Sequence, residues 1–215
     1  MRFKLPLQSV AAVLLSLTMT SMPAFSADVA GPFSYPAGLL YAPATLTQPV
    51  GDYAQFGMNR VFLEDTTLFD LASLTGATRL REGTGDFKRD TLCLSGTENG
   101  RPLIAWFIAT DTDKVTEVQA EWVGENEVPE YCRPLEANRL PVRLGRIGLG
   151  MSEKEVADLI GPSSYVDNAG WHYWFSQRFM RNEKNLQELE LNWLALRFDD
   201  NARVERAFIS QVTNL

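Results

Sequence analysis

The sequence predicts an α+β fold, in which short capped helices pack on one face of antiparallel sheets. Residues 65–76 and 151–161 carry the start and stop residues of two short helices. Each is followed by segments of strand composition that polar turns separate. Runs of strands after a helix favour antiparallel pairing over a parallel sheet. Because this order occurs twice, we expect two tandem helix-plus-hairpin units.

The first 26 residues have the pattern of a secretory signal peptide. Arg2 and Lys4 precede an apolar stretch at 10–17, and Ala-Phe-Ser at 24–26 is a small-x-small cleavage pattern. The stretch is too short to cross ~30 Å of hydrocarbon comfortably, so a retained anchor is the less favoured alternative. No cysteine lies near the cleavage site. We therefore expect an exported protein, periplasmic or secreted, with no membrane span and no lipid anchor.

Proline-rich stretches divide the remaining chain. Residues 27–50 hold prolines interleaved with Gly, Ala and Thr, which prevents both a helix and a central strand. We expect an extended arm there, packed on the body through its aromatic side chains. Residues 124–142 have the proline and acidic composition of a linker. The first unit is thus assigned to residues 51–123 and the second to residues 143–215.

The first unit begins with the helix at 65–76. Asp65 or Thr66 can cap it, leucines face inward, and Gly76 ends it. Strands are predicted at 90–95, 103–109 and 115–123. The last of these alternates, so its apolar residues are expected inward and its other face is expected in solvent. That solvated face holds Glu117, Gln119 and Glu121.

The second unit begins with the helix at 151–161. Ser152 and Glu155 have the spacing of a capping box, and Gly161 followed by Pro162 stops the helix. Strands are predicted at 171–175, at 194–198 and from 204 onward, with an acidic turn at 199–202.

Cysteine content and charge narrow the class of protein. Cys93 and Cys132 are the only cysteines, and an isolated pair in an exported chain favours a disulfide over a metal site. The formal net charge is −7. An acidic chain is repelled by nucleic acid and by anionic lipid, so neither is an expected partner.

Catalytic patterns are missing from the sequence. The single histidine, His172, lies within a strand segment, where a solvent-facing or half-buried residue is the simpler interpretation. No Gly-x-Ser-x-Gly, His-Glu-x-x-His or phosphate-binding glycine loop occurs. We expect no enzymatic activity, no cofactor and no metal site.

Aromatic residues supply the candidate binding surface. The segment at 171–175 places Trp171 and Tyr173 on one strand face and His172 and Trp174 on the other. An exposed Trp174 would mark a protein interface, although a loop or the arm can also cover it. The loop at 163–170 offers a second surface. The candidate protein-binding residues are Trp171, Tyr173, Trp174, Tyr165 and Asp167.

Three motifs resemble the SmpA/OmlA family, which includes a small lipoprotein of the outer-membrane barrel-assembly machine. They are the Gly-Met-Ser to Leu-Ile-Gly-Pro helix at 150–162, Trp-x-Tyr-x-Phe at 171–175 and Leu-x-Phe-Asp-Asp-Asn at 196–201. The resemblance covers residues 145–212. The chain departs from that lipoprotein because it has no lipid-bearing cysteine and has a large additional N-terminal half. The doubled unit is also similar to the family of secreted β-lactamase inhibitory proteins.

These resemblances imply two functions of different kinds. The first is a periplasmic protein-interaction module in outer-membrane or envelope assembly or maintenance. The second is a secreted inhibitor of a hydrolase such as a β-lactamase, with Tyr165 and Asp167 as the residues best placed to enter an active site. An uncharacterised enzyme would require His172 beside two carboxylates in a cleft.

Overall fold

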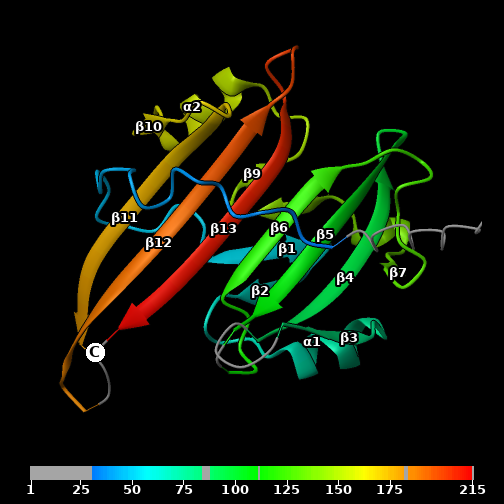
Figure 1. Cartoon of the computed structure of the whole chain (residues 1–215), viewed down its shortest axis with the longest axis horizontal. Coiled ribbons are helices and arrows are strands. Elements are labelled where there is room, and N and C mark those ends of the chain that lie inside the picture. The colour runs from blue at the N-terminus through cyan, green and yellow to red at the C-terminus, as the bar shows by residue number, and fades with distance from the viewer. Residues whose placement is uncertain (1–30, 84–87, 111, 182–183, 215) are drawn as a thin grey trace, which may run out of the picture.

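The computed structural model describes residues 31–83, 88–110, 112–181 and 184–214. Over this part of the chain the fold is mainly β, with 48% strand and 11% helix (Figure 1). The prediction of an α+β fold is therefore wrong. The expected signal peptide, residues 1–26, and the beginning of the arm lie outside the described residues.

The two α-helices of the described residues are too short to cover a sheet. The helix α1 (Leu68–Thr75) buries Leu68 and Leu71, and α2 (Glu153–Ile160) buries Val156. Each has eight residues. Eight residues span only about 12 Å, at 1.5 Å per residue. Part of the face assigned to the helices is covered by a second sheet instead.

Local sequence signals located the start of α2 correctly and the start of α1 to within a few residues. The predicted capping box of α2 is present, because Ser152 N donates to Glu155 Oε2 at 2.7 Å and Glu155 N donates to Ser152 Oγ at 3.3 Å. The N-cap of α1 is Thr67, not Asp65 or Thr66.

A large antiparallel sheet forms the main layer. Its strand order is β10-β11-β12-β13-β6-β5-β4-β3, and β7 (Arg133–Pro134) adds to β4 in parallel. The bounds are β3 Arg79–Glu82, β4 Arg89–Glu98, β5 Arg101–Ala109, β6 Glu117–Trp122, β10 Tyr165–Val166, β11 Trp171–Arg181, β12 Gln187–Phe198 and β13 Val204–Asn214.

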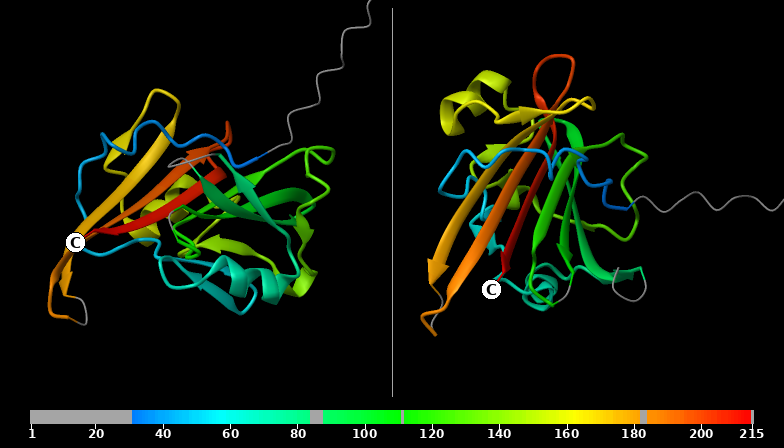
Figure 2. Two further views of the ribbon diagram at one scale, coloured as in Figure 1. Left: turned by 60° about the horizontal axis from the view of Figure 1, so that its bottom comes forward. Right: turned by 60° about the vertical axis from the view of Figure 1, so that its left-hand side comes forward.

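A smaller sheet covers part of one face. It has the order β2-β1-β8-β9, with β1 Tyr53–Phe56, β2 Asn59–Phe62, β8 Val142–Leu144 and β9 Ile147–Gly148. These strands have two to four residues each, too few to show an alternating pattern, and they were not predicted. Figure 2 shows the small sheet and α1 on the side of the main sheet opposite the arm.

Both halves repeat one order of elements. α1 precedes β3 to β6, and α2 precedes β10 to β13, while β6 pairs with β13 and β1 with β8. The first residue of each helix donates its backbone N–H to a carbonyl in the turn before the last strand of its half. Leu68 N donates to Asp113 O at 2.8 Å, and Glu153 N donates to Ala202 O at 3.0 Å. One hydrophobic core runs through both halves.

The other face of the main sheet is covered by two irregular segments. The arm crosses β11 to β13, as Figure 1 shows in blue, and Phe33 and Leu39 pack on the buried cluster there. The segment at 123–132 covers β4 and β5, where Val123, Val128 and Tyr131 pack around buried Trp106.

This cover overturns the expectation of a solvated acidic face on β6. The side chains concerned lie between the arm and the 123–132 segment. Glu117 is 2% exposed, Gln119 0% and Glu121 9%. Strand alternation places these residues on one face of the sheet. That face is buried because the arm, about eighty positions earlier in the sequence, packs on it.

Candidate functional site

Trp174 is buried and offers almost no surface to a partner. Its side chain is 3% exposed and belongs to the main core. Its Nε1 donates to the carbonyl of Gly161, at the end of α2, at 3.0 Å. The indole N–H is therefore hydrogen-bonded to the end of a helix, and not to the proline-rich arm.

The other two candidates on β11 lie beneath the arm. Trp171 is 6% exposed and Tyr173 is fully buried. The ring of Phe33 lies 5.4 Å from that of Trp171. The hydroxyl of Tyr173 accepts a hydrogen bond from Gly38 N at 2.9 Å. Both residues thus attach the arm to the sheet.

Asp167 and Tyr165 support the same attachment. Tyr173 donates its hydroxyl proton to Asp167 Oδ2 at 2.6 Å, and Tyr165 packs against the Tyr173 ring. Burial raises the pKa of Tyr173, and the Asp167 carboxylate raises it further. Burial opposes ionisation of Asp167, yet the hydrogen bonds from Tyr173 and from backbone N–H groups hold its pKa below the usual range. Asp167 is therefore an ionised structural acceptor.

A second polar cluster lies where the arm crosses β6. Gln119 Nε2 donates to Glu117 Oε1 and to the Phe33 carbonyl, the latter at 3.2 Å. Burial raises the pKa of Glu117 to about 7, against the opposing hydrogen bonds from Gln119 and Tyr35. Burial, and then the charge of Glu117, raise the pKa of Tyr35 to about 12. The arm therefore packs beside a buried carboxyl group whose pKa is raised to about 7.

His172 does not lie between two carboxylates. Its Nδ1 is 3.8 Å from Glu153 Oε1, and its ring meets Phe198 edge-on at 4.9 Å. Its side chain is 21% exposed. Within the described ranges, no group of three His, Cys, Asp or Glu residues is arranged to hold a metal ion.

The predicted disulfide is present and organises the second irregular segment. Cys93 on β4 is bonded to Cys132, 39 residues later, with a Cα–Cα separation of 4.6 Å. Both half-cystines are buried with Trp106 in one cluster. The bond fixes the segment at 123–132 against β4.

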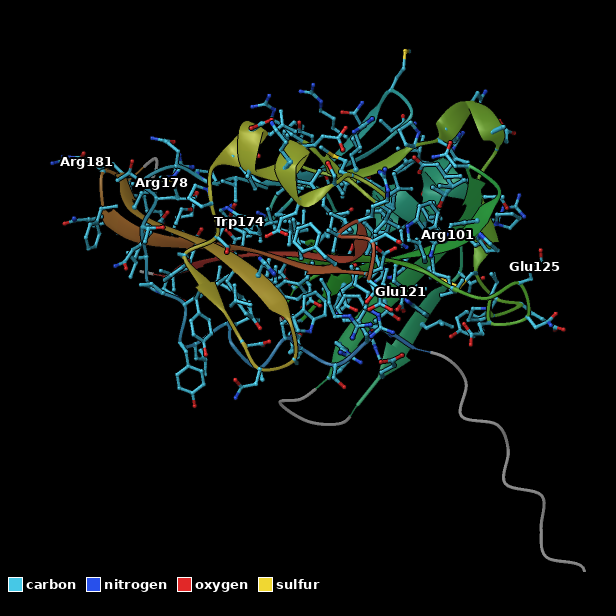
Figure 3. All side chains as sticks on the ribbon, turned by 90° about the horizontal axis from the view of Figure 1, so that it is seen from above. Arg101, Glu121, Glu125, Trp174, Arg178 and Arg181 are labelled. Carbon is cyan, nitrogen blue, oxygen red and sulfur yellow. A yellow bond between two sulfur atoms is a disulfide. The ribbon has the colours of Figure 1, made fainter. Side chains whose placement is uncertain are left out.

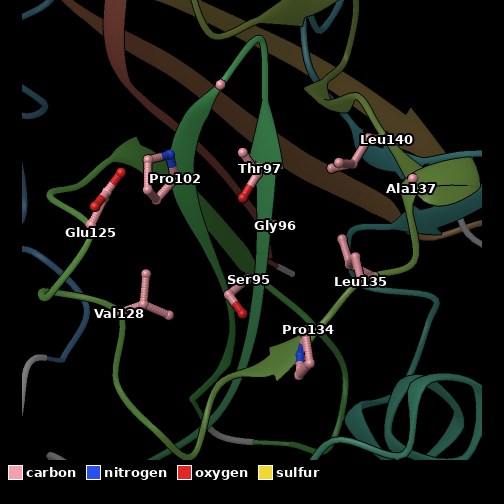
Figure 4. Close-up of a pocket in the computed structure, with 11 residues that line it drawn as sticks. Ser95, Gly96, Thr97, Pro102, Glu125, Val128, Pro134, Leu135, Ala137 and Leu140 are labelled. Carbon is pink, nitrogen blue, oxygen red and sulfur yellow. The ribbon is translucent and has the colours of Figure 1, made fainter.

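Beside this disulfide lies a groove of about 520 Å³. In Figure 4, β4 runs along its floor, Glu125 and Val128 form one wall, and Leu135, Ala137 and Leu140 form the other. The complete lining is Ser95, Gly96, Thr97, Gly100, Pro102, Glu125, Val128, Pro134, Leu135, Ala137 and Leu140. Thr97, Glu125 and Ala137 are exposed, so the groove is open to solvent along its length.

Glu125 is the only lining residue with a charged side chain. No salt bridge or hydrogen bond of its carboxylate occurs within the described residues. Figure 3 shows Glu125 at the end of the molecule opposite Arg178 and Arg181. The groove therefore combines apolar walls with one unpaired negative charge.

Sequence reasoning missed this groove because it assigned residues 124–142 to a linker. The available signal was the cysteine pair, since a bond from Cys132 to a strand brings the neighbouring prolines onto the sheet. None of the five predicted protein-binding residues lines the groove.

Comparisons of the chain with protein-family models, with curated proteins and with solved structures found no match. The resemblance to the SmpA/OmlA family thus stays a prediction based on its motifs. The disulfide is compatible with an exported protein. In the part of the chain that the structure describes, no helix has the length and apolar character to cross a membrane.

Proposed function

We propose that the chain is an exported, non-catalytic protein-interaction module that binds its partner in the groove beside β4. The motif resemblance supports a role in outer-membrane or envelope assembly or maintenance. The observation that carries the proposal is the groove itself. It is a concave surface with apolar walls, built on a disulfide-linked strand and open at its exposed edges.

The size and chemistry of the groove fit a protein segment. Its volume of about 520 Å³ falls in the range of ligand sites, roughly 300–1,000 Å³. Leu135, Leu140 and Val128 offer apolar contacts, and the backbone of β4 lies between them. Such an open surface suits a chain segment better than an enclosed small molecule.

Site-specific photo-cross-linking tests the proposal. A benzophenone amino acid placed at Ala137, on the groove wall, is expected to give adducts with an envelope protein in the cells that make this chain. The same probe at Asn201, in the exposed turn after β12, is the control and is expected to give none.

Competition makes the result specific to the groove. When the cross-linking is repeated in an envelope extract of these cells, excess purified wild-type protein is expected to suppress the Ala137 adducts. A variant with Ala137→Trp, in which a larger side chain occupies the groove wall, is expected not to suppress them. Circular dichroism must show that the variant is folded. If no adduct forms at Ala137, or if both competitors act equally, the proposal is wrong.

The loop at 163–170 supports the second candidate, a hydrolase inhibitor. Asp167 Oδ1 accepts from Ala169 N and Trp171 N at 2.9 and 3.0 Å, which fixes the loop, and Val166 is 47% exposed. A preorganised loop loses little entropy on binding. Nitrocefin hydrolysis by β-lactamases and peptidoglycan hydrolysis, each with and without the purified protein, test this candidate. Inhibition that Val166→Asp abolishes is the expected result, and unchanged hydrolysis contradicts it.

A further inference from the structure

We infer that the groove binds an extended, basic peptide segment, which adds as a short strand to the free edge of β4 at Thr97 and directs a Lys or Arg side chain to Glu125. This inference rests on the proposed function and specifies the chemistry of the partner. Its support comes from the backbone of β4, from an equivalent strand edge in the other half and from the charge of the groove.

The first support is the direction of the Thr97 backbone groups. Ser95 O accepts from Leu135 N at 2.7 Å, so the backbone groups of Ser95 point away from β5. Residues two apart in a strand point their N–H and C=O to the same side. Thr97 therefore points the same way. Its partner on β5 is Pro102, which has no N–H to donate.

No strand of the described residues occupies that edge at Thr97. The parallel pairing of β7 with β4 ends at Ser95, and the chain then turns into a 3₁₀ helix at Ala137–Arg139. Both the N–H and the C=O of Thr97 are therefore directed at the groove without a backbone partner there. Free strand edges of this kind accept extended peptides by β-strand addition.

The second support is the equivalent edge in the other half. Val115 N donates to Thr66 O and Val204 N donates to Met151 O, which relates the two halves residue by residue. Six residues after these valines lie Glu121 on β6 and Ser210 on β13, and from there the strand registers lead to Ser95 on β4 and Phe175 on β11. Two residues further along these strands, Thr97 is equivalent to Gln177.

At that equivalent edge the chain carries an added segment of its own. Leu46 of the arm lies parallel to β11, donates its N–H to Phe175 O at 3.3 Å and accepts from Gln177 N at 3.1 Å. In the first half, Leu135 makes the first of these two bonds but not the second. The second half therefore has a bound segment at Gln177, whereas the first half has none at the equivalent residue, Thr97.

The third support is charge. Glu125 is the one charged lining residue, it is exposed, and its loop also holds Glu127 and Glu130. Glu125 lies on the wall opposite the free edge of β4, so a long basic side chain on the added segment would have to cross the groove to meet this carboxylate, while an apolar neighbour would contact Leu140 beside the edge. Complementary charge of this kind selects the partner and its register.

Titration with defined peptides tests the inference on the whole mature protein. The probe is fluorescein-labelled Thr-Val-Lys-Val-Lys-Val-Thr, and the comparison peptide has Glu in place of both Lys. We expect the Lys peptide to bind at least about fivefold more tightly at low salt, since an exposed ion pair contributes up to ~1 kcal/mol. Glu125→Lys is expected to reverse the preference, and Glu130→Lys, on the same loop but outside the groove lining, is the matched control.

The backbone contact has its own measurement. Binding of the Lys peptide is expected to slow hydrogen exchange of the Thr97 amide by at least about tenfold. N-methylation of the central peptide bonds is expected to remove both this protection and the binding, because a methylated nitrogen cannot donate.

The outcomes separate this inference from the proposed function. Equal binding of the two peptides, or binding that N-methylation leaves unchanged, overturns the inference while Ala137 cross-links keep the groove as a protein-binding site. If Ala137 gives no cross-links and neither peptide binds, the proposed function fails with it. Both proposals are supported if the preference for the Lys peptide reverses in Glu125→Lys and persists in Glu130→Lys, and if the peptide protects the Thr97 amide from exchange.

Discussion

At the scale of single residues, Glu117 links the arm to the centre of the sheet. Its carboxyl is 2% exposed and lies against Gln119 and Tyr35. Burial raises its pKa from 4.5 to about 7, so the folded protein retains a proton that the unfolded chain releases. The resulting stabilisation is complete below about pH 4.5 and is lost as the pH rises through about 7.

The change Glu117→Gln is therefore expected to remove a pH-dependent part of the stability. From pH 4.5 to pH 8, wild-type protein should lose about 3 kcal/mol of unfolding free energy relative to the variant. Urea unfolding at both pH values measures this difference. Glu125→Gln, an exposed carboxyl, is the control. A wild-type curve parallel to that of Glu117→Gln would show that folding does not raise the pKa of Glu117.

Trp174 gives a second prediction at this scale. Because the indole is buried under the end of α2 and bonded to the Gly161 carbonyl, Trp174→Ala is expected to cost about 3–5 kcal/mol of unfolding free energy. Trp174→Phe keeps most of the buried ring and should cost less. Chemical denaturation measures both changes. A Trp174→Ala protein of wild-type stability that had lost partner binding would instead place Trp174 on an interface.

At the scale of elements, the sequence predicts what local chemistry determines. The capping box at Ser152, the helix stop at Gly76 and the apolar strand at 103–109 all appear in the structure. The small sheet escaped prediction because its strands are too short for a periodic signal. The burial of Glu117 and the groove beside Cys132 escaped because contacts between distant segments produce them.

The disulfide joins two elements of the fold, β4 and the segment at 123–132, and its removal should affect both stability and the groove. It closes a loop of 39 residues and holds one groove wall against β4. Replacing Cys93→Ala and Cys132→Ala together is expected to cost ~2–4 kcal/mol of unfolding free energy. Cross-linking from Ala137 should fall as well, because Val128 and Glu125 are no longer held opposite it. Urea titration and adduct yield measure the two effects. An unchanged adduct yield in a destabilised variant would show that the groove forms without the disulfide.

At the scale of the whole molecule, one sheet joins the two halves. β6 of the first half pairs with β13 of the second along Arg206–Ser210. Phe107, Leu144 and Ile209, from three different parts of the chain, meet in the same core. Neither half can therefore bury its apolar surface alone, even though each repeats the same order of elements. The internal repeat describes the topology, and the shared core determines how the protein folds.

Separated halves are thus expected not to fold. A fragment of residues 143–215 would expose the β13 edge, lose the arm that covers Trp171 and lose the small-sheet partner of β8. We expect its ¹⁵N–¹H spectrum to show the narrow dispersion of an unfolded chain, and mixing with a fragment of residues 27–142 to restore the wild-type spectrum. In the intact protein, far-ultraviolet circular dichroism and tryptophan fluorescence should report one coincident unfolding transition. A dispersed spectrum from 143–215 alone, or two separate transitions, would show that the second half is an autonomous domain whose pairing with β6 is a docking contact and not a condition of its folding.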